Sequence, residues 1–148
     1  MLREAHAVWK DGSYAGEGVL STTSGILNNT KYTFGSLTGL MGSTSPAEML
    51  AAAIASCMSR MVALEMAKTG IKPDQVETYA ILKVDFVGEA LRIVGVHLSI
   101  SARTSSSECD RFEEAVESAR RECPIASVLN LDIQCEAKLF AAPAPALV

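Results

Sequence analysis

Residues 45–70 read SPAEMLAAAIASCMSRMVALEMAKTG and contain signals for both the start and the end of one long helix. Ser45 is suited to cap this helix, Pro46 suits its first turn, and Glu48 completes the S-x-x-E spacing of a capping box. Gly70 marks the end, so the predicted helix has about 24 residues and a length of about 36 Å at 1.5 Å per residue. The helix is apolar on nearly every side, and a helix of this kind must be enclosed all round.

The segments outside this helix have the periodicities of strands and of shorter helices. Alternating or β-branched runs between turn residues predict strands, and an apolar period of 3.6 residues predicts an amphipathic helix. The expected elements are strands at 5–9 and 16–21, a loop at 35–44, strands at 79–87 and 91–102, helices at 107–122 and 125–129, and a last strand at 131–139. This order indicates an α+β fold with a mostly antiparallel sheet around the long helix. We expect a single domain over residues 1–140 and a disordered Ala/Pro tail at 141–148.

One face of the 91–102 strand carries four apolar side chains, each two residues from the next. They are Val94, Val96, Leu98 and Ile100. A strand with this pattern buries that face against a core. A single sheet covers only one side of a helix that is apolar all round, so the other side needs a second subunit. We therefore expect an intertwined homodimer.

The composition sets limits on the class of protein. Of the 148 residues, 49% are hydrophobic and 20% are charged, as in globular domains. The net charge of -4 and the scattered Lys and Arg residues argue against nucleic acid as a partner. The apolar stretch 49–66 is interrupted by Arg60 and Glu65, so it indicates a buried helix and not a membrane span. Residues 1–10 contain no signal-like apolar segment, and we expect a cytoplasmic protein without a membrane partner.

The four cysteines are candidates for redox chemistry, because disulfide frameworks are rare in a reducing compartment. Cys109 is expected at the surface, and Cys135 is expected to pack as a small hydrophobe on the last strand. Cys123 precedes proline, which pushes it out of the helical region toward an N-cap, where backbone N–H groups favour a thiolate. Cys57 lies within the apolar helix, where burial alone raises its pKa unless a cation or donor is nearby. The residues by themselves favour Cys123 as the reactive thiol.

Other types of site have little support in the sequence. His6 and His97 lie in expected strands with no cysteine at ligand spacing, so a zinc site is not expected. The sequence contains no phosphate-binding loop, dinucleotide fingerprint or G-x-S-x-G elbow. We therefore expect no bound metal and no bound cofactor.

Three stretches of the sequence resemble one known protein family. They are GVLSTTSGIL at 18–27, TSPAEMLAAAIASC at 44–57 and ECPIASVL at 122–129. Together they are similar to the OsmC/Ohr family, which comprises the osmotically inducible protein C and the organic hydroperoxide resistance proteins. The resemblance covers nearly the whole chain, from residue 4 to residue 140. The segments YTF at 32–34 and CPIASVL at 123–129 look closer to the OsmC branch.

The resemblance implies a thiol-dependent peroxidase that acts on organic hydroperoxides and less readily on hydrogen peroxide. It implies a tightly wrapped homodimer with active sites at the subunit interface, in pockets lined by Met and Leu. In such a protein, Cys57 would be the peroxidatic cysteine that becomes a sulfenic acid. Cys123 would be the resolving cysteine that forms a disulfide with it, and an external dithiol such as a lipoyl protein would reduce that disulfide. The chemistry requires no metal.

The resemblance also assigns charged groups to the site. Glu48 matches the family's active-site glutamate, although it also fits the capping box. Nine residues along a helix place Glu48 and Cys57 on opposite sides, so Glu48 is expected to serve the cysteine of the partner subunit. The arginine of the OsmC branch is replaced by Leu37, and Arg60, one turn beyond Cys57, is a possible substitute cation. Without the family arginine, the alternative is a catalytically weak ligand-binding or redox-sensing protein.

Overall fold

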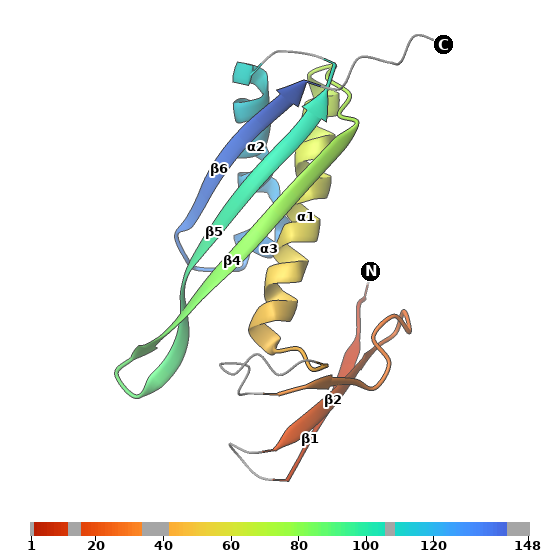
Figure 1. The fold of residues 1–148 in the computed structure, drawn as a ribbon, viewed down its shortest axis with the longest axis vertical. Helices are drawn as coiled ribbons and strands as arrows, with labels where there is room; N and C mark the ends of the chain where they lie inside the picture. Colours follow the sequence, from red (N-terminus) through yellow and green to blue (C-terminus); the bar gives the residue numbers. More distant parts are fainter. Residues whose placement is uncertain (1, 12–15, 34–41, 106–108, 142–148) are drawn as a thin grey trace. The chain divides into compact units, whose positions relative to one another are not determined.

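The computed structural model describes residues 2–11, 16–33, 42–105 and 109–141. The chain divides into two compact units, Met1–Leu50 and Ala51–Val148, and each has its own three-stranded sheet. Figure 1 shows the elements in chain order. They are β1 (Ala5–Lys10), β2 (Glu17–Thr22), β3 (Thr30–Tyr32), α1 (Pro46–Lys68), β4 (Gln75–Val87), β5 (Ala90–Thr104), α2 (Cys109–Glu122), α3 (Pro124–Ser127) and β6 (Ile133–Ala141). The α+β class is confirmed, but the expectation of one sheet is wrong.

The first unit contains an antiparallel sheet in the order β1-β2-β3. Gly18 in the central strand pairs with Trp9 on one side and Tyr32 on the other. The two aromatic rings pack with their centroids 5.6 Å apart, and a Cβ atom on Gly18 would clash with the Tyr32 ring. The sequence did not predict β3, because three residues are too few for a period-2 pattern to be recognised. Most of the expected loop at 35–44 lies outside the described residues.

Helix α1 begins and ends almost where the sequence predicts. The Ser45 hydroxyl accepts a hydrogen bond from the Glu48 backbone N–H at 3.1 Å, which confirms the N-cap. The Glu48 carboxylate accepts from the Thr44 hydroxyl at 2.7 Å, so it also holds the chain that leads into the helix. At the other end, Gly70 has a φ of 83°, and the Ile71 N–H donates to the Met66 carbonyl at 3.0 Å. Glycine adopts this left-handed conformation without strain and so ends the helix.

One chain buries α1 along one side only, and the cover that we expect from a second subunit on the other side stays a prediction. In one chain its buried residues form a single stripe with helical spacing. They are Ile54, Met58, Met61, Val62, Glu65 and Met66. Leu64 remains 43% exposed, because one chain supplies packing partners along one side of the helix only.

Helix α1 is also long and apolar enough to cross a membrane by length and composition, a test that core helices of soluble proteins pass as well. Glu65 favours the core interpretation, because its buried carboxylate accepts from Lys68 Nζ at 2.6 Å and from Ser118 Oγ at 3.0 Å. The Lys68 ammonium, followed by the Ser118 hydroxyl, lowers the pKa of this carboxyl group despite its desolvation. The contact with Ser118 joins α1 to α2.

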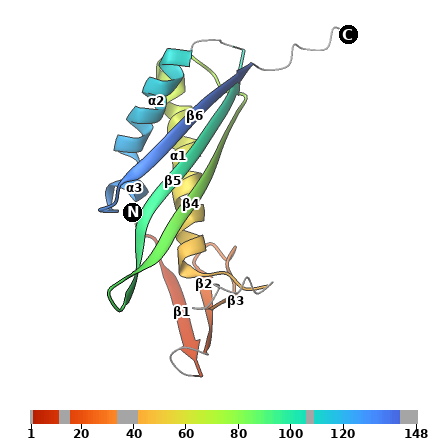
Figure 2. The same cartoon turned by 60° about the vertical axis from the view of Figure 1, so that its left-hand side comes forward.

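The second unit has a sheet in the order β4-β5-β6. Strands β4 and β5 form the expected antiparallel hairpin, which turns at Gly88 with a φ of 65°. Strand β6 runs parallel to β5, since α2 and α3 carry the chain back across the sheet before β6 begins. Taken over both sheets, the pairing of neighbouring strands is mostly antiparallel, as expected. Figures 1 and 2 show α1 and α2 on the same face of this sheet.

The core of the second unit lies between that sheet face and the helices. Val96, Leu98 and Ile100 are buried as predicted, together with residues of α2 such as Phe112. Val94 was expected with them but is 38% exposed, because the strand register shifts between Lys83 and Val84. Gly95 pairs with Lys83 and Ile93 with Val84, so Val94 is the extra residue of a β-bulge and leaves the core face.

The expected C-terminal tail is shorter than 141–148. Ala141 belongs to β6 and pairs with Thr104 of β5. Residues 142–148 lie outside the described part of the chain, so their expected disorder stays a prediction.

Candidate functional site

The second unit brings two cysteines together that are 66 residues apart in the sequence. The Cys123 thiol donates a hydrogen bond to Cys57 Sγ, and the two sulfur atoms are 2.9 Å apart. Cys57 lies in the middle of α1 and is half-buried, whereas Cys123 precedes α3 and is 0% exposed. Both are free thiols, and a covalent bond between them needs an approach of only about 1 Å.

Cys123 is the N-cap of α3, as the sequence predicts. Its φ of -68° and ψ of 117° are extended, as Pro124 requires of the residue before it. The sulfur accepts a hydrogen bond from the Ala126 N–H at 3.5 Å, and the Cys123 carbonyl accepts from the Ser127 N–H at 2.9 Å. The sequence C-P-I-A-S therefore holds the sulfur by local hydrogen bonds.

The surroundings of Cys57 favour its neutral thiol over its thiolate. Burial is the largest cause that raises the pKa of Cys57, and the neighbouring Cys123 raises it further. The backbone N–H of Ile125 and the charge of Arg60 lower the pKa but do not compensate. The pKa of Cys57 is therefore above its ordinary value in one chain. The Ile125 amide was missed by sequence reasoning, because which amide reaches Cys57 depends on how α3 packs against α1.

Arg60 is an exposed residue of α1 and lies one helical turn beyond Cys57. Its positive charge lowers the pKa of Cys57, although this effect is the smallest of those acting on the thiol. Within the part of the chain that the structure describes, Arg60 forms no ion pair. Arg60 therefore acts on the thiol through its charge.

Glu48 lies in the first turn of α1, where its carboxylate is exposed and accepts from Thr44. An acidic side chain at this end of a helix is favoured by the helix dipole. The capping role therefore explains Glu48 within one chain, and a role toward the cysteine of a partner subunit stays a prediction. Leu37, which is expected to replace an arginine of the OsmC branch, lies outside the described residues.

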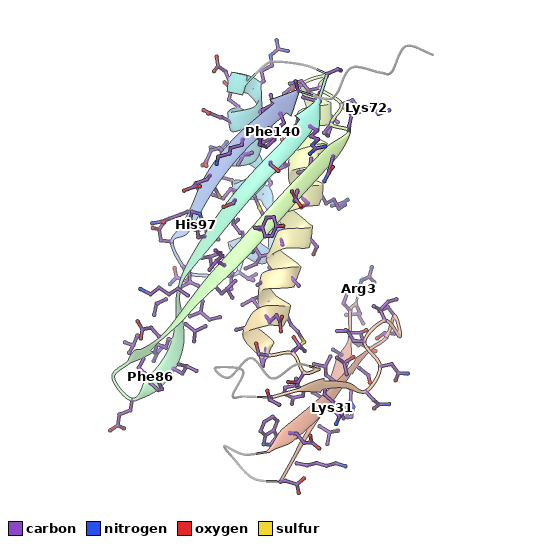
Figure 3. All side chains as sticks on the ribbon, in the orientation of Figure 1. Arg3, Lys31, Lys72, Phe86, His97 and Phe140 are labelled. Carbon is purple, nitrogen blue, oxygen red and sulfur yellow. The ribbon has the colours of Figure 1, made fainter. Side chains whose placement is uncertain are left out.

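Elsewhere in the described part of the chain, cysteine and histidine side chains do not gather into a second site. Cys135 is half-buried on β6, and burial raises its pKa, as expected for a thiol that packs as a small hydrophobe. Cys109 opens α2. His97 Nε2 lies 3.8 Å from the Glu136 carboxylate on the outer side of the sheet, where Figure 3 labels it. Among the described residues, no group of three or more His, Cys, Asp or Glu side chains is arranged to hold a metal.

A hollow of about 780 Å³ lies beside the β-bulge of the second unit. It is lined by Ile81, Leu82, Lys83, Val84, Val94, Gly95, Val96, His97, Asp132 and Gln134. Neither cysteine of the pair lines it, so this hollow has no direct part in the chemistry of the two sulfurs.

Comparison with known proteins identifies relatives that cover nearly the whole chain. A family model described as "OsmC-like protein" matches residues 39–138. The chain is 27% identical over 137 residues to "Peroxiredoxin OsmC" of Escherichia coli (strain K12), covering 93% of this chain and 96% of the relative. The corresponding protein of Shigella flexneri matches to the same extent.

Two solved structures show the same fold. An OsmC-like protein of unknown function from Vibrio cholerae superposes with a TM-score of 0.78 at 15% identity, over 93% of this chain and 99% of that one. The organic hydroperoxide resistance protein OhrB of Bacillus subtilis superposes with a TM-score of 0.66 at 20% identity, over 93% of this chain and 98% of that one. At these identities the likeness concerns the fold alone.

Proposed function

Because this chain belongs to the OsmC-like protein family, we propose that it is a thiol-dependent peroxidase that reduces organic hydroperoxides and, less readily, hydrogen peroxide. The observation that carries the proposal is the 2.9 Å separation of the Cys57 and Cys123 sulfur atoms. The names of the relatives, a peroxiredoxin and an organic hydroperoxide resistance protein, support the same chemistry. We propose that the protein acts in the cytoplasm.

The first step takes place at Cys57, whose half-buried sulfur is the more accessible of the pair. Its thiolate attacks the terminal oxygen of the hydroperoxide, so that an S–O bond forms and the O–O bond breaks. The leaving alkoxide takes a proton and departs as the alcohol. Cys57 is then a sulfenic acid, and the hydroperoxide has been reduced by two electrons.

The second step uses Cys123, which lies within hydrogen-bond distance of Cys57. Its sulfur attacks the sulfur of the Cys57 sulfenic acid, forms the disulfide and expels the hydroxyl group as water. An external dithiol, such as a lipoyl protein, then reduces this disulfide by two electrons and completes the cycle. No bound metal or cofactor takes part in either step.

The test of the proposed function is a coupled consumption assay. If the protein turns over, cumene hydroperoxide and dihydrolipoamide are consumed in a ratio of one to one. Consumption of the hydroperoxide without oxidation of the dithiol would contradict the cycle.

We propose further that the active protein is a homodimer in which Glu48 of the partner subunit serves Cys57. The support is the open side of α1, where Leu64 is 43% exposed in one chain. A helix this apolar is stabilised by a second copy of the same surface. Light scattering on the dilute protein should give about twice the chain mass of 15.7 kDa. A monomeric mass would contradict this part of the proposal.

One observation favours a second candidate function, a slow redox switch or ligand-binding protein. Burial and Cys123 raise the pKa of Cys57, so the thiolate fraction at pH 7 is smaller than for a free cysteine. Efficient catalysis then requires groups from a partner subunit that lower this pKa again. Measuring the pKa of Cys57 in the assembled protein separates the two functions: a value below that of free cysteine supports the peroxidase, and one above it supports the switch.

Arg60 offers a specific test of thiol activation. The Arg60→Gln substitution removes a positive charge that lowers the pKa of Cys57, so the pKa rises and the thiolate fraction at neutral pH falls. We expect alkylation of Cys57 by iodoacetamide at pH 7 to slow by about two- to threefold. An exposed charge one helical turn away stabilises the thiolate by less than about 1 kcal/mol in water.

The readout for Arg60→Gln is peptide mass spectrometry, which distinguishes Cys57 from the other cysteines. Arg92→Gln is the matched control, because Arg92 is an exposed arginine of the same unit on the β4–β5 hairpin. It should leave the alkylation rate unchanged. Equal effects of the two substitutions would show that Arg60 has no particular influence on the thiol.

A further inference from the structure

The two sulfur atoms of the pair differ sharply in their access to solvent. Cys57 is half-buried and therefore partly reachable, whereas Cys123, the N-cap of α3, is completely buried. Thiol–disulfide exchange depends on which sulfur an incoming thiolate can approach. Once the pair is oxidised, an external thiol meets the Cys57 side of the disulfide first.

The local hydrogen bonds add a second asymmetry. The Ala126 N–H donates to Cys123 Sγ at 3.5 Å, so this sulfur has a backbone hydrogen-bond donor beside it when the disulfide opens. A sulfur that leaves as a stabilised thiolate leaves faster. Because this donor belongs to the same tight turn as the sulfur, it stays in place while Cys123 leaves.

We propose that the external thiol attacks Cys57 Sγ of the oxidised pair and releases Cys123 as the thiolate. This inference rests on the proposed function, since it concerns the regeneration of the same site. A bond forms between the incoming sulfur and Cys57 Sγ while the Cys57–Cys123 bond breaks. The electron pair of the broken bond moves to Cys123, which then takes up a proton. The second thiol of a dithiol attacks the incoming sulfur, releases Cys57 and leaves as a cyclic disulfide, so the reductant loses two electrons and the protein gains two.

The proposal assigns the two cysteines different partners during regeneration. Cys57 carries the mixed disulfide with the reductant, and Cys123 stays a free thiol. A reductant for this protein therefore needs a thiol that can approach the half-buried Cys57.

The test traps the mixed disulfide in the full-length wild-type protein. The pair is oxidised with diamide, so the experiment does not depend on any peroxidase activity. The disulfide is then treated briefly with glutathione, a monothiol that cannot complete the exchange, and quenched with acid. Free thiols are blocked with N-ethylmaleimide, and peptide mass spectrometry locates both labels.

We expect glutathione on Cys57 and N-ethylmaleimide on Cys123, with at least about a tenfold excess over the opposite arrangement at the earliest times. Glutathione on Cys123, an even distribution, or a disulfide that glutathione does not open would each overturn the proposal. Failure of the peroxidase assay with normal trapping on Cys57 would instead refute the proposed function and leave this inference standing.

A second measurement uses the reduced protein and needs no disulfide between the pair. The Cys123→Ser variant, which keeps Cys57, should form a mixed disulfide with 5,5′-dithiobis(2-nitrobenzoate) at least about ten times faster than Cys57→Ser, which keeps Cys123. Peptide mapping excludes the contributions of Cys109 and Cys135. Equal rates would show that burial does not restrict access to Cys123 and would contradict the proposal.

Discussion

Replacing Cys57 by serine is expected to lower the rate of cumene hydroperoxide reduction by at least about 10⁴-fold, the scale on which enzymes lose activity when their nucleophile is removed. A serine hydroxyl at this position is not ionised near neutral pH, so it cannot attack the O–O bond as the thiolate does. The measurement is the steady-state oxidation of dihydrolipoamide at fixed protein and hydroperoxide concentrations. Full turnover by Cys57→Ser would show that the proposed mechanism is wrong.

The matched control for Cys57 is Cys135→Ser. Cys135 is also a half-buried free cysteine of the second unit, but it lies on β6 and is not part of the pair. This variant should keep the activity of the wild type. Loss of activity in both variants would point to a general effect of removing half-buried thiols, such as partial unfolding, and not to nucleophilic catalysis.

Replacing Phe112 by alanine is expected to lower the free energy of unfolding by about 3–5 kcal/mol. Phe112 is 1% exposed and packs from α2 into the core of the second unit. Its removal deletes buried apolar surface and leaves a cavity that the surrounding side chains fill only in part. Urea denaturation measures the change, and its slope with denaturant should stay that of the wild type.

Phe140→Ala provides the control with the same change of side chain. Phe140 lies on β6, is 49% exposed and is labelled on the sheet in Figure 3. Its replacement should change the free energy of unfolding by no more than about 1 kcal/mol, since substitutions at such positions leave no closed cavity. Similar losses for the two variants would contradict the assignment of the core to the helix-covered face of the sheet.

Several features of the fold could be predicted because their causes lie within a few residues. The N-cap at Ser45 and the stop at Gly70 placed the ends of α1 to within one residue. The rule that a residue before proline is extended placed Cys123 at the N-cap of α3. The two long strands and the amphipathic helix followed from periodicity, which requires neighbouring residues only.

Other features depended on contacts between distant segments and were missed or misjudged. Strand β6 lies beside β5 in parallel, and the sequence contains no direct sign of that partner or direction. Val94 leaves the core face because the β4–β5 register shifts, which its alternating pattern does not reveal. The Ile125 amide acts on Cys57 only because α3 packs beside α1.

The cysteine pair combines both kinds of information. Helical periodicity placed Cys57 in an apolar helix, and the C-P motif placed Cys123 at a cap, because both depend on the residues immediately around them. The 2.9 Å between their sulfur atoms and the complete burial of Cys123 arise from the packing of α1, α3 and the sheet against one another. Such packing depends on many side chains at once, so it cannot be deduced from the residues around each cysteine. The local pattern identified the two cysteines. Only the folded chain made them a pair with one accessible sulfur and one buried sulfur.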